Sequence, residues 1–181
     1  MNGRTEASTP GHPRDPAGPA GARPAPAREG QRSAAGAWPL LSGLGPLGAL
    51  PTAPRLGRAF AVLVLGGWGL GGMTEAAELI VSEMASNVVR AAANPDGSLV
   101  YDAHGRLPVL WLRLLSDLRQ TRIEVWDNLP AGRGVPAARR PGPEEESGRG
   151  LELVAAISQR WGWEPVPGRQ AKCVWALLTV Q

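Results

Sequence analysis

Residues 74–93 read TEAAELIVSEMASNVVRAAA, and this stretch decides how the rest of the chain is organised. Its apolar residues recur at three- and four-residue spacing, the period of a helix with one buried face. Thr74 is a favourable N-cap, and acids in the first turn complement the helix dipole. The sequence therefore predicts an amphipathic helix from Glu75 to about Ala93, ended by the turn formers of residues 94–97. The apolar face consists of Ala77, Ile80, Val81, Met84, Val88 and Ala91.

The residues before this helix predict another helix and a tail. A first helix is expected over residues 54–68, ended by the glycines that follow. Residues 1–54 are dominated by Pro, Ala, Gly and Arg, with almost no aliphatic periodicity before Trp38. Such a segment cannot bury enough apolar surface to offset its chain entropy. We therefore expect a disordered tail over residues 1–54 and a folded domain over residues 55–181.

The residues after the helix predict strands. Residues 99–101 suggest a short strand, and residues 109–114 and 122–126 read as two longer ones joined by a polar connection. Side chains alternate between the two faces of a strand, so Ile123, Val125 and Asp127 share one face. The opposite face of the same strand carries Arg122, Glu124 and Trp126.

A long loop and a third helix complete the pattern. Residues 129–147 have no apolar periodicity, and a loop of that length within a domain tends to be functional. A helix is expected to begin at Gly150, and residues 161–164 and 173–178 read as closing strands. This order of elements predicts a two-layer α/β sandwich, with helices on one face of a mixed, mostly antiparallel sheet.

Charge and composition exclude several classes of protein. Through Arg58 there are seven Arg and three acidic residues, a net of +4, whereas the rest has twelve basic and thirteen acidic residues, a net of −1. The basic charge therefore belongs largely to the tail, and a nucleic-acid-binding surface is not expected.

The lone Cys173 excludes an internal disulfide and fits a reducing cytoplasm. The longest apolar stretch, residues 59–73, is shorter than the roughly twenty residues of a membrane span. We expect a cytoplasmic protein without a membrane partner.

Two polar residues of the predicted long helix lie on one face. Glu83 and Asn87 are four residues apart, or about 6 Å along a helix axis. An Asn carbonyl oxygen is a hard ligand suited to Mg²⁺, and a neighbouring Glu can act as a general base. Taken alone, however, the pair is explained more simply as a solvated polar face.

Two further features suggest a nucleotide site. Asp127 ends an apolar strand, where a half-buried carboxylate can accept a hydrogen bond from an exocyclic amine such as that of adenine. Its alternative role is that of a turn residue capping the sequence DNLP. Gly148, Arg149 and Gly150 precede a helix, which lets the backbone and the helix N-terminus approach a phosphate. Glycines also make plain turns, and no Walker A lysine follows these.

Together these features resemble the histidine-kinase-like ATPase (Bergerat fold) family. VSEMASNVVRA (81–91), IEVWD (123–127), GRGLELV (148–154) and the terminal RWGW and KCVWALL resemble small actinobacterial ATP-binding regulators related to anti-sigma factor serine/threonine kinases. The resemblance covers about residues 55–181 and implies a Bergerat-type sandwich with a nucleotide lid over residues 129–147. It also implies a role for each candidate residue: Glu83 as catalytic base, Asn87 as Mg²⁺ ligand, Asp127 as acceptor of the adenine amine, and Gly148, Arg149, Gly150 and Leu151 at the phosphates.

The chain departs from the family pattern at two places. The usual D-x-G-x-G motif reads DNLPA over residues 127–131, so the turn beside adenine lacks its glycines, and the frequent His four residues after Asn87 is Ala91.

The resemblance implies a regulator of transcription that binds ATP and Mg²⁺. Such a protein phosphorylates a Ser or Thr of an antagonist protein, sequesters a sigma factor and can form a homodimer. The alternative is an ATP-binding interaction module without turnover, whose lid order sets partner affinity. A third reading is a stable α/β domain whose site is vestigial.

Overall fold

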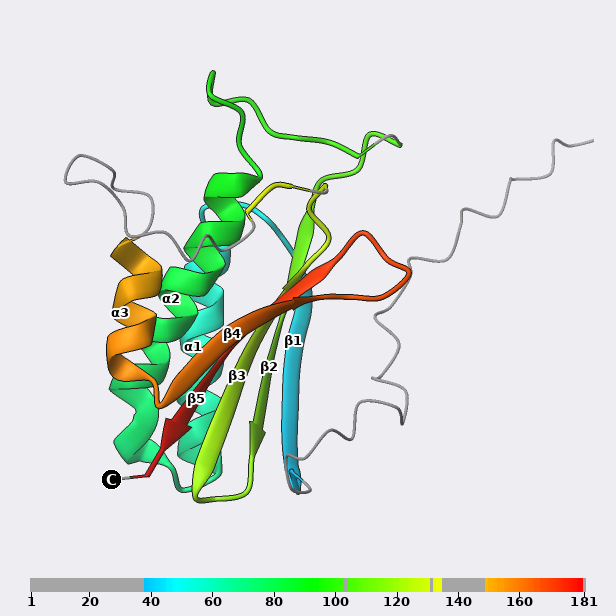
Figure 1. Ribbon diagram of the computed structural model, residues 1–181. Coiled ribbons are helices and arrows are strands. Elements are labelled where there is room, and N and C mark those ends of the chain that lie inside the picture. Colours follow the sequence, from blue (N-terminus) through cyan, green and yellow to red (C-terminus); the bar gives the residue numbers. More distant parts are fainter. Residues whose placement is uncertain (1–37, 103, 131, 135–148, 181) are drawn as a thin grey trace, which may run out of the picture. The chain divides into compact units, whose positions relative to one another are not determined.

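The computed structural model describes residues 38–102, 104–130, 132–134 and 149–180, except for the side chain of Arg149. These residues form a two-layer α/β fold in which three α-helices cover one face of a five-stranded sheet (Figure 1). The strand order is β1-β2-β3-β5-β4, and every neighbouring pair is antiparallel. The predicted two-layer α/β arrangement is confirmed, whereas the expected mixed sheet is wholly antiparallel in this part of the chain. The elements are β1 (Leu40–Gly48), α1 (Ala53–Gly67), η2 (Gly71–Met73), α2 (Thr74–Ala91), β2 (Val109–Ser116), β3 (Gln120–Asp127), α3 (Arg149–Ile157), β4 (Arg160–Pro165) and β5 (Lys172–Thr179).

The helices lie where the apolar period predicts them, but the start of α2 differs. Thr74 is the first residue inside α2, and the N-cap position belongs to Met73, which makes no side-chain capping bond. The prediction of Thr74 as N-cap is therefore wrong. The reason is η2, whose turn leads directly into α2 with Met73 already near helical dihedrals (φ −93°, ψ −5°). A chain that enters from a 3₁₀ turn has its first N–H groups bonded without a capping hydroxyl.

β1 lies inside the segment expected to be a disordered tail. It pairs with β2 along its length, and Leu44 and Leu47 pack against the core. The expectation of a tail reaching residue 54 is wrong for residues 40–54, which form β1, a short turn and the start of α1. Local composition does not indicate a strand here, because the stability of this segment comes from pairing with a strand more than sixty residues away. Residues 1–37 lie outside the described part of the chain.

The short strand expected at residues 99–101 is also absent from the structure. Leu99 makes only an isolated bridge to Ala93, and the surrounding residues form a loop between α2 and β2. The turn formers after α2 dominate here, because Asp96 accepts from both the backbone N–H and the hydroxyl of Ser98.

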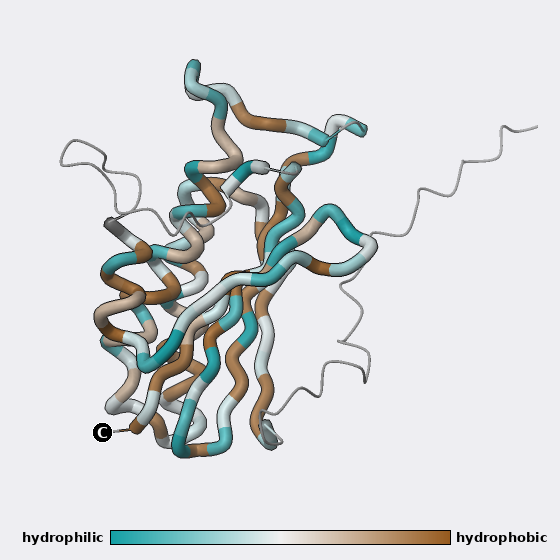
Figure 2. The backbone as a smooth tube through the Cα atoms, viewed as in Figure 1, coloured by the Kyte–Doolittle hydropathy of each residue, from teal (hydrophilic) through white to brown (hydrophobic). Residues whose placement is uncertain are grey.

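The core lies between the helices and the sheet, where the apolar segments of both layers meet (Figure 2). Ile123 and Val125 belong to this core, and Asp127 on the same face of β3 is fully buried. The predicted alternation along β3 is therefore confirmed. Other core residues are Leu110, Leu112 and Leu114 of β2, and Ile80, Met84 and Val88 of α2.

The opposite face of the sheet carries a network of polar and aromatic side chains. Glu124 pairs with Arg122 at 2.8 Å and with Arg113 at 3.7 Å, and Nε1 of Trp126 donates to it at 3.0 Å. The Arg122 guanidinium lies over the ring of Trp175, 4.3 Å from its centroid. These contacts provide hydrogen-bond and charge partners for the carboxylate of Glu124, which is only 6% exposed.

No helix in the described ranges has the length and apolar character needed to cross a membrane.

Candidate functional site

Asp127 is the most deeply buried of the predicted site residues whose side chains the structure describes. It ends β3, is 0% exposed, and faces Lys172 directly across the β3–β5 ladder. The Nζ of Lys172 donates to Oδ1 at 2.7 Å, and the backbone N–H of Leu129 donates to the same oxygen at 3.1 Å. The other oxygen, Oδ2, is buried and has no hydrogen-bond partner among the described residues. The structure therefore places an acceptor without a donor at the position predicted to receive an exocyclic amine.

The electrostatic balance at this pair is unusual for an aspartate. Burial raises the pKa of Asp127 above its ordinary value, and this effect outweighs the ammonium of Lys172 and the N–H of Leu129, which lower it. A buried acceptor without a donor carries a desolvation cost of about 1–3 kcal/mol. A ligand that donates to Oδ2 would relieve that cost and would favour the ionised carboxylate.

Glu83 and Asn87 lie one turn apart on α2, as the sequence predicts, and both are half-buried. Nη2 of Arg90 donates to Oδ1 of Asn87, which is the oxygen expected to bind Mg²⁺. A metal ion at this oxygen would therefore displace Arg90. The described residues include no group of three or more His, Cys, Asp or Glu that could hold a metal by themselves. Mg²⁺ held here would depend on phosphate and water oxygens, which is its usual mode in nucleotide sites.

The second predicted run lies against the first. α3 begins at Arg149, and a Cβ built on Gly150 would meet the Glu83 carboxylate, with Cδ at 3.1 Å and Cβ at 3.5 Å. The missing side chain of Gly150 thus allows α3 to pack closely against α2, in addition to any phosphate contact. Leu151 is half-buried next to it. Gly148 lies outside the described residues, as does the side chain of Arg149.

Residues 132–134 connect the Asp127 end of the sheet to the end of α2. The Arg133 guanidinium donates to the carbonyls of Ala91 and Ala93 at 3.3 and 3.2 Å, and to Oδ1 of Asn94 at 2.9 Å. Its own carbonyl accepts from Lys172 Nζ at 3.1 Å. Arg133 therefore supplies donors to carbonyls at the C-terminal end of α2, where a cation is favourable. The rest of the predicted lid, residues 135–148, lies outside the described residues.

Gly134 packs tightly between these elements. Its φ is +59°, and a Cβ there would come within 2.8 Å of the Ala91 Cβ and 3.3 Å of Lys172 Nζ. The C-terminal end of α2 and the Asp127–Lys172 pair are thus close neighbours across Gly134. The structure brings the α2 and β3 ends of the predicted site together, and it brings α3 against Glu83.

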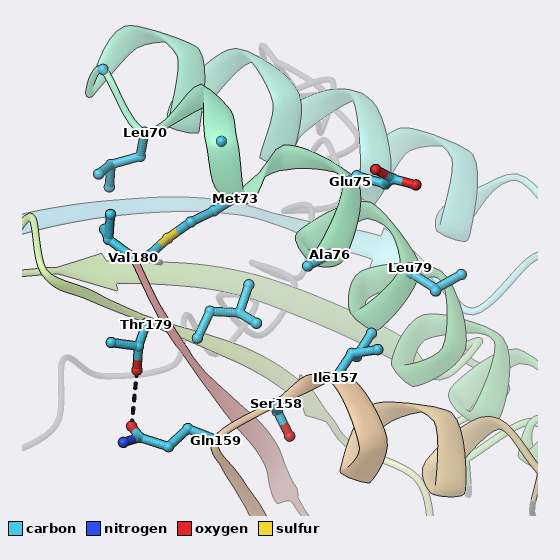
Figure 3. A pocket seen from close by; sticks show the side chains of 13 residues that line it. Leu70, Met73, Glu75, Ala76, Leu79, Ile157, Ser158, Gln159, Thr179 and Val180 are labelled. Atoms are coloured by element: carbon cyan, nitrogen blue, oxygen red, sulfur yellow. Dashed lines mark hydrogen bonds between the residues drawn. The ribbon is translucent and has the colours of Figure 1, made fainter.

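A cavity of about 910 Å³ lies elsewhere (Figure 3). It is at the other end of the sheet, because its lining residue Thr179 pairs with Gln120, whereas Asp127 pairs with Lys172. Thr179 Oγ1 donates to Oε1 of Gln159 at its edge, at 3.0 Å. The walls are mainly apolar, and none of the predicted nucleotide residues that the structure describes contributes to them. Its apolar lining consists mostly of Leu70, Met73, Ala76, Leu79, Ile157 and Val180.

No protein-family model matches this sequence, and no curated protein matches it.

Two site residues, Lys172 and Arg133, were not predicted from the sequence. Lys172 had a detectable signal, because it shares a strand face with Val174, Ala176 and Leu178, all of which are apolar. A lysine in register with a buried face requires a buried partner, and the strand-end Asp127 was the available carboxylate. Arg133 had no such signal, since nothing in a Gly- and Pro-rich loop indicates where a side chain will bind.

Proposed function

We propose that the chain binds ATP and Mg²⁺ in the manner of the histidine-kinase-like ATPases, at the end of the sheet formed by Asp127, the C-terminal half of α2 and the start of α3. The observation that carries the proposal is the buried Oδ2 of Asp127, which has no donor among the described residues. The exocyclic amine of adenine supplies such a donor. The two-layer α/β fold and the positions of Glu83 and Asn87 on one side of α2 are compatible with this site.

Each residue has a proposed role in binding. Asp127 accepts from the adenine amine through Oδ2, and Asn87 contributes an oxygen to Mg²⁺ once Arg90 releases it. The N-terminal end of α3, with Arg149, Gly150 and Leu151, lies near the phosphates, where helix N–H groups favour negative charge. Mg²⁺ would neutralise phosphate charge and orient the terminal phosphate.

We further propose that the protein is a regulator related to anti-sigma factor kinases. In this role Glu83 accepts the proton of a Ser or Thr hydroxyl on an antagonist protein as that oxygen attacks the terminal phosphorus of ATP, while the bond from this phosphorus to the bridging oxygen breaks and ADP leaves. The regulated partner would be a sigma factor. Catalysis in this reaction class depends mainly on positioning and charge neutralisation, which α2 and the start of α3 would supply.

A second candidate function is an ATP-binding interaction module without turnover. The contact between Glu83 and Gly150 favours it, because a carboxylate beside the first turn of a helix stabilises that helix whether or not it acts as a base. In this case ATP would order the segment between β3 and α3 and so change the affinity for a partner.

The binding proposal is tested by equilibrium titration with a fluorescent ATP analogue and Mg²⁺. Wild type should show saturable binding, and Asp127→Asn should weaken it by about tenfold to a hundredfold, the range for a hydrogen bond to a charged group. Asp117→Asn is the matched control, because within the described residues the Asp117 carboxylate accepts only from backbone N–H groups of the exposed β2–β3 turn. Absence of saturable binding by folded wild type would contradict the proposal.

The two functional roles are separated by label transfer. Wild type is incubated with radiolabelled ATP and candidate antagonist proteins, in parallel with Glu83→Gln. Transfer that is lost in Glu83→Gln, with ATP affinity retained, supports the kinase. Saturable ATP binding without any transfer supports the module.

A further inference from the structure

We propose that Lys172 and Asp127 together recognise the adenine base of ATP. The Lys172 ammonium donates a hydrogen bond to a ring nitrogen next to the exocyclic amine. The inference rests on the proposed ATP site and adds a second recognition residue to it. Asp127 would supply the acceptor and Lys172 the donor of one recognition pair.

Strand register places the two groups together. Asp127 and Lys172 are directly opposite in the β3–β5 ladder and point to the helix-covered face of the sheet. Lys172 is 8% exposed, and Nζ lies 2.7 Å from Oδ1 of Asp127. The contact to Oδ1 leaves Oδ2 as the acceptor for a ligand. Any group that donates to Oδ2 therefore also comes close to the ammonium.

The ammonium has the capacity for this bond. It carries three N–H donors, of which one goes to Asp127 and one to the carbonyl of Arg133 at 3.1 Å. The carbonyl oxygen of Arg133 is a neutral hydrogen-bond acceptor that lies beside the Asp127 carboxylate. A ring nitrogen of a bound purine would be an acceptor of the same kind in the same place. A base could take over this donor from Arg133 or use the third one.

Arg133 and Gly134 lie against the Asp127–Lys172 pair. Gly132 and Gly134, which flank Arg133, have φ values of +84° and +59°, a region that glycine occupies at little cost. Arg133 holds the segment through bonds to the end of α2, all of them with part-buried atoms. Access of a base to Asp127 requires this short segment to shift, and the shift frees the Lys172 donor that Arg133 occupies.

Adenine matches the resulting pattern. It presents an amine donor with a ring acceptor on either side, N1 on the Watson–Crick edge and N7 on the Hoogsteen edge. An adjacent acceptor and donor on the protein, Oδ2 and the ammonium, complement either edge. A carboxylate alone would recognise only the amine.

The test compares ATP with two analogues, 1-deaza-ATP and 7-deaza-ATP, each of which lacks one ring acceptor. Wild type should bind one of them about tenfold more weakly than ATP, the range for loss of a hydrogen bond to a charged donor. The analogue that loses affinity identifies the edge. Lys172→Met should bind ATP and that analogue equally well, whereas Arg169→Met, a change at an exposed residue of the neighbouring turn, should keep the discrimination.

A second readout does not depend on a variant that folds. Lys172 is the only lysine of the chain, so protein labelled with isotopic lysine gives one side-chain signal in an NMR spectrum. ATP should shift this signal, and the weakly binding analogue at saturation should shift it differently.

The outcomes of this test are distinct. Wild type that binds ATP and both analogues with equal affinity, or Lys172→Met that keeps the full discrimination, overturns the role of Lys172 and leaves the ATP site standing. Failure of wild type to bind ATP removes the proposed function and this inference with it.

Discussion

Gly150 at the start of α3 lies directly against the carboxylate of Glu83 on α2. These residues are 67 positions apart in the sequence, and they belong to the two runs that first suggest a nucleotide site. The contact joins the predicted base to the predicted phosphate-binding turn. It also gives Gly150 a packing role that is independent of any ligand.

Replacement of Gly150 by alanine should show energetic coupling between positions 150 and 83. Alanine favours a helix over glycine by about 1 kcal/mol, but its Cβ would require the Glu83 carboxylate to move. Gly150→Ala should therefore leave the free energy of unfolding nearly unchanged in wild type and raise it by about 1 kcal/mol in a Glu83→Ala background. Urea denaturation followed by circular dichroism measures both values. Glu83→Gln keeps the side-chain volume and should behave like wild type; equal stabilisation in all backgrounds would refute the close contact.

The Asp127–Lys172 pair should behave as a buried ion pair. Removal of one partner leaves an uncompensated buried charge, so Asp127→Leu and Lys172→Met should each lower the free energy of unfolding by about 3–5 kcal/mol. The double variant should lose much less than the sum, because neither charge is left alone. The exposed pair of Asp102 and Arg106, also 2.7 Å apart, is the control and should show a coupling below about 1 kcal/mol. Additive losses in the buried pair would contradict the structure.

The pKa of Asp127 predicts a specific dependence of stability on pH. Burial raises this pKa above the ordinary 3.8, so the folded protein holds the proton more tightly than the unfolded chain. The resulting stabilisation is fully present below pH 3.8 and is lost as the pH rises through the folded-state pKa. Wild type should therefore lose stability relative to Asp127→Asn as the pH rises through this window. Urea denaturation of both variants over a pH series measures the difference, and the opposite slope would show that the ion pair outweighs burial.

Two glycines of β1 test whether this strand belongs to the sheet. Gly45 has φ +134°, and a Cβ there would lie 2.8 Å from Trp111 Cδ1 and 3.0 Å from the Leu110 carbonyl oxygen. Gly45→Ala should therefore lower the free energy of unfolding by about 1–3 kcal/mol. At Gly43 the nearest atoms are at 3.7 and 3.8 Å, so Gly43→Ala should be nearly neutral. Thermal denaturation compares the two, and equal behaviour would place β1 outside the sheet.

Local patterns in the sequence account for the parts of the fold that were predicted. α2 follows from one apolar face repeated every three to four residues, and β3 from the alternation that places Ile123, Val125 and Asp127 on one side. These periods depend on backbone geometry alone, so they can be read without knowing what packs against them. The same alternation made Asp127 an inward-facing carboxylate before any partner for it was known.

The tertiary structure decided what lies opposite each of these residues. It added β1, whose composition resembles a tail, because pairing with β2 and burial against α1 stabilise a segment that has little local preference. It brought Lys172 into contact with Asp127, Arg133 with the C-terminal end of α2, and Gly150 with Glu83. Each of these contacts joins residues at least 39 positions apart, and strand register and helix packing set them. The sequence by itself determined which faces are buried, and only the folded chain determined that one buried carboxylate oxygen is paired with a lysine while the other has no donor among the described residues.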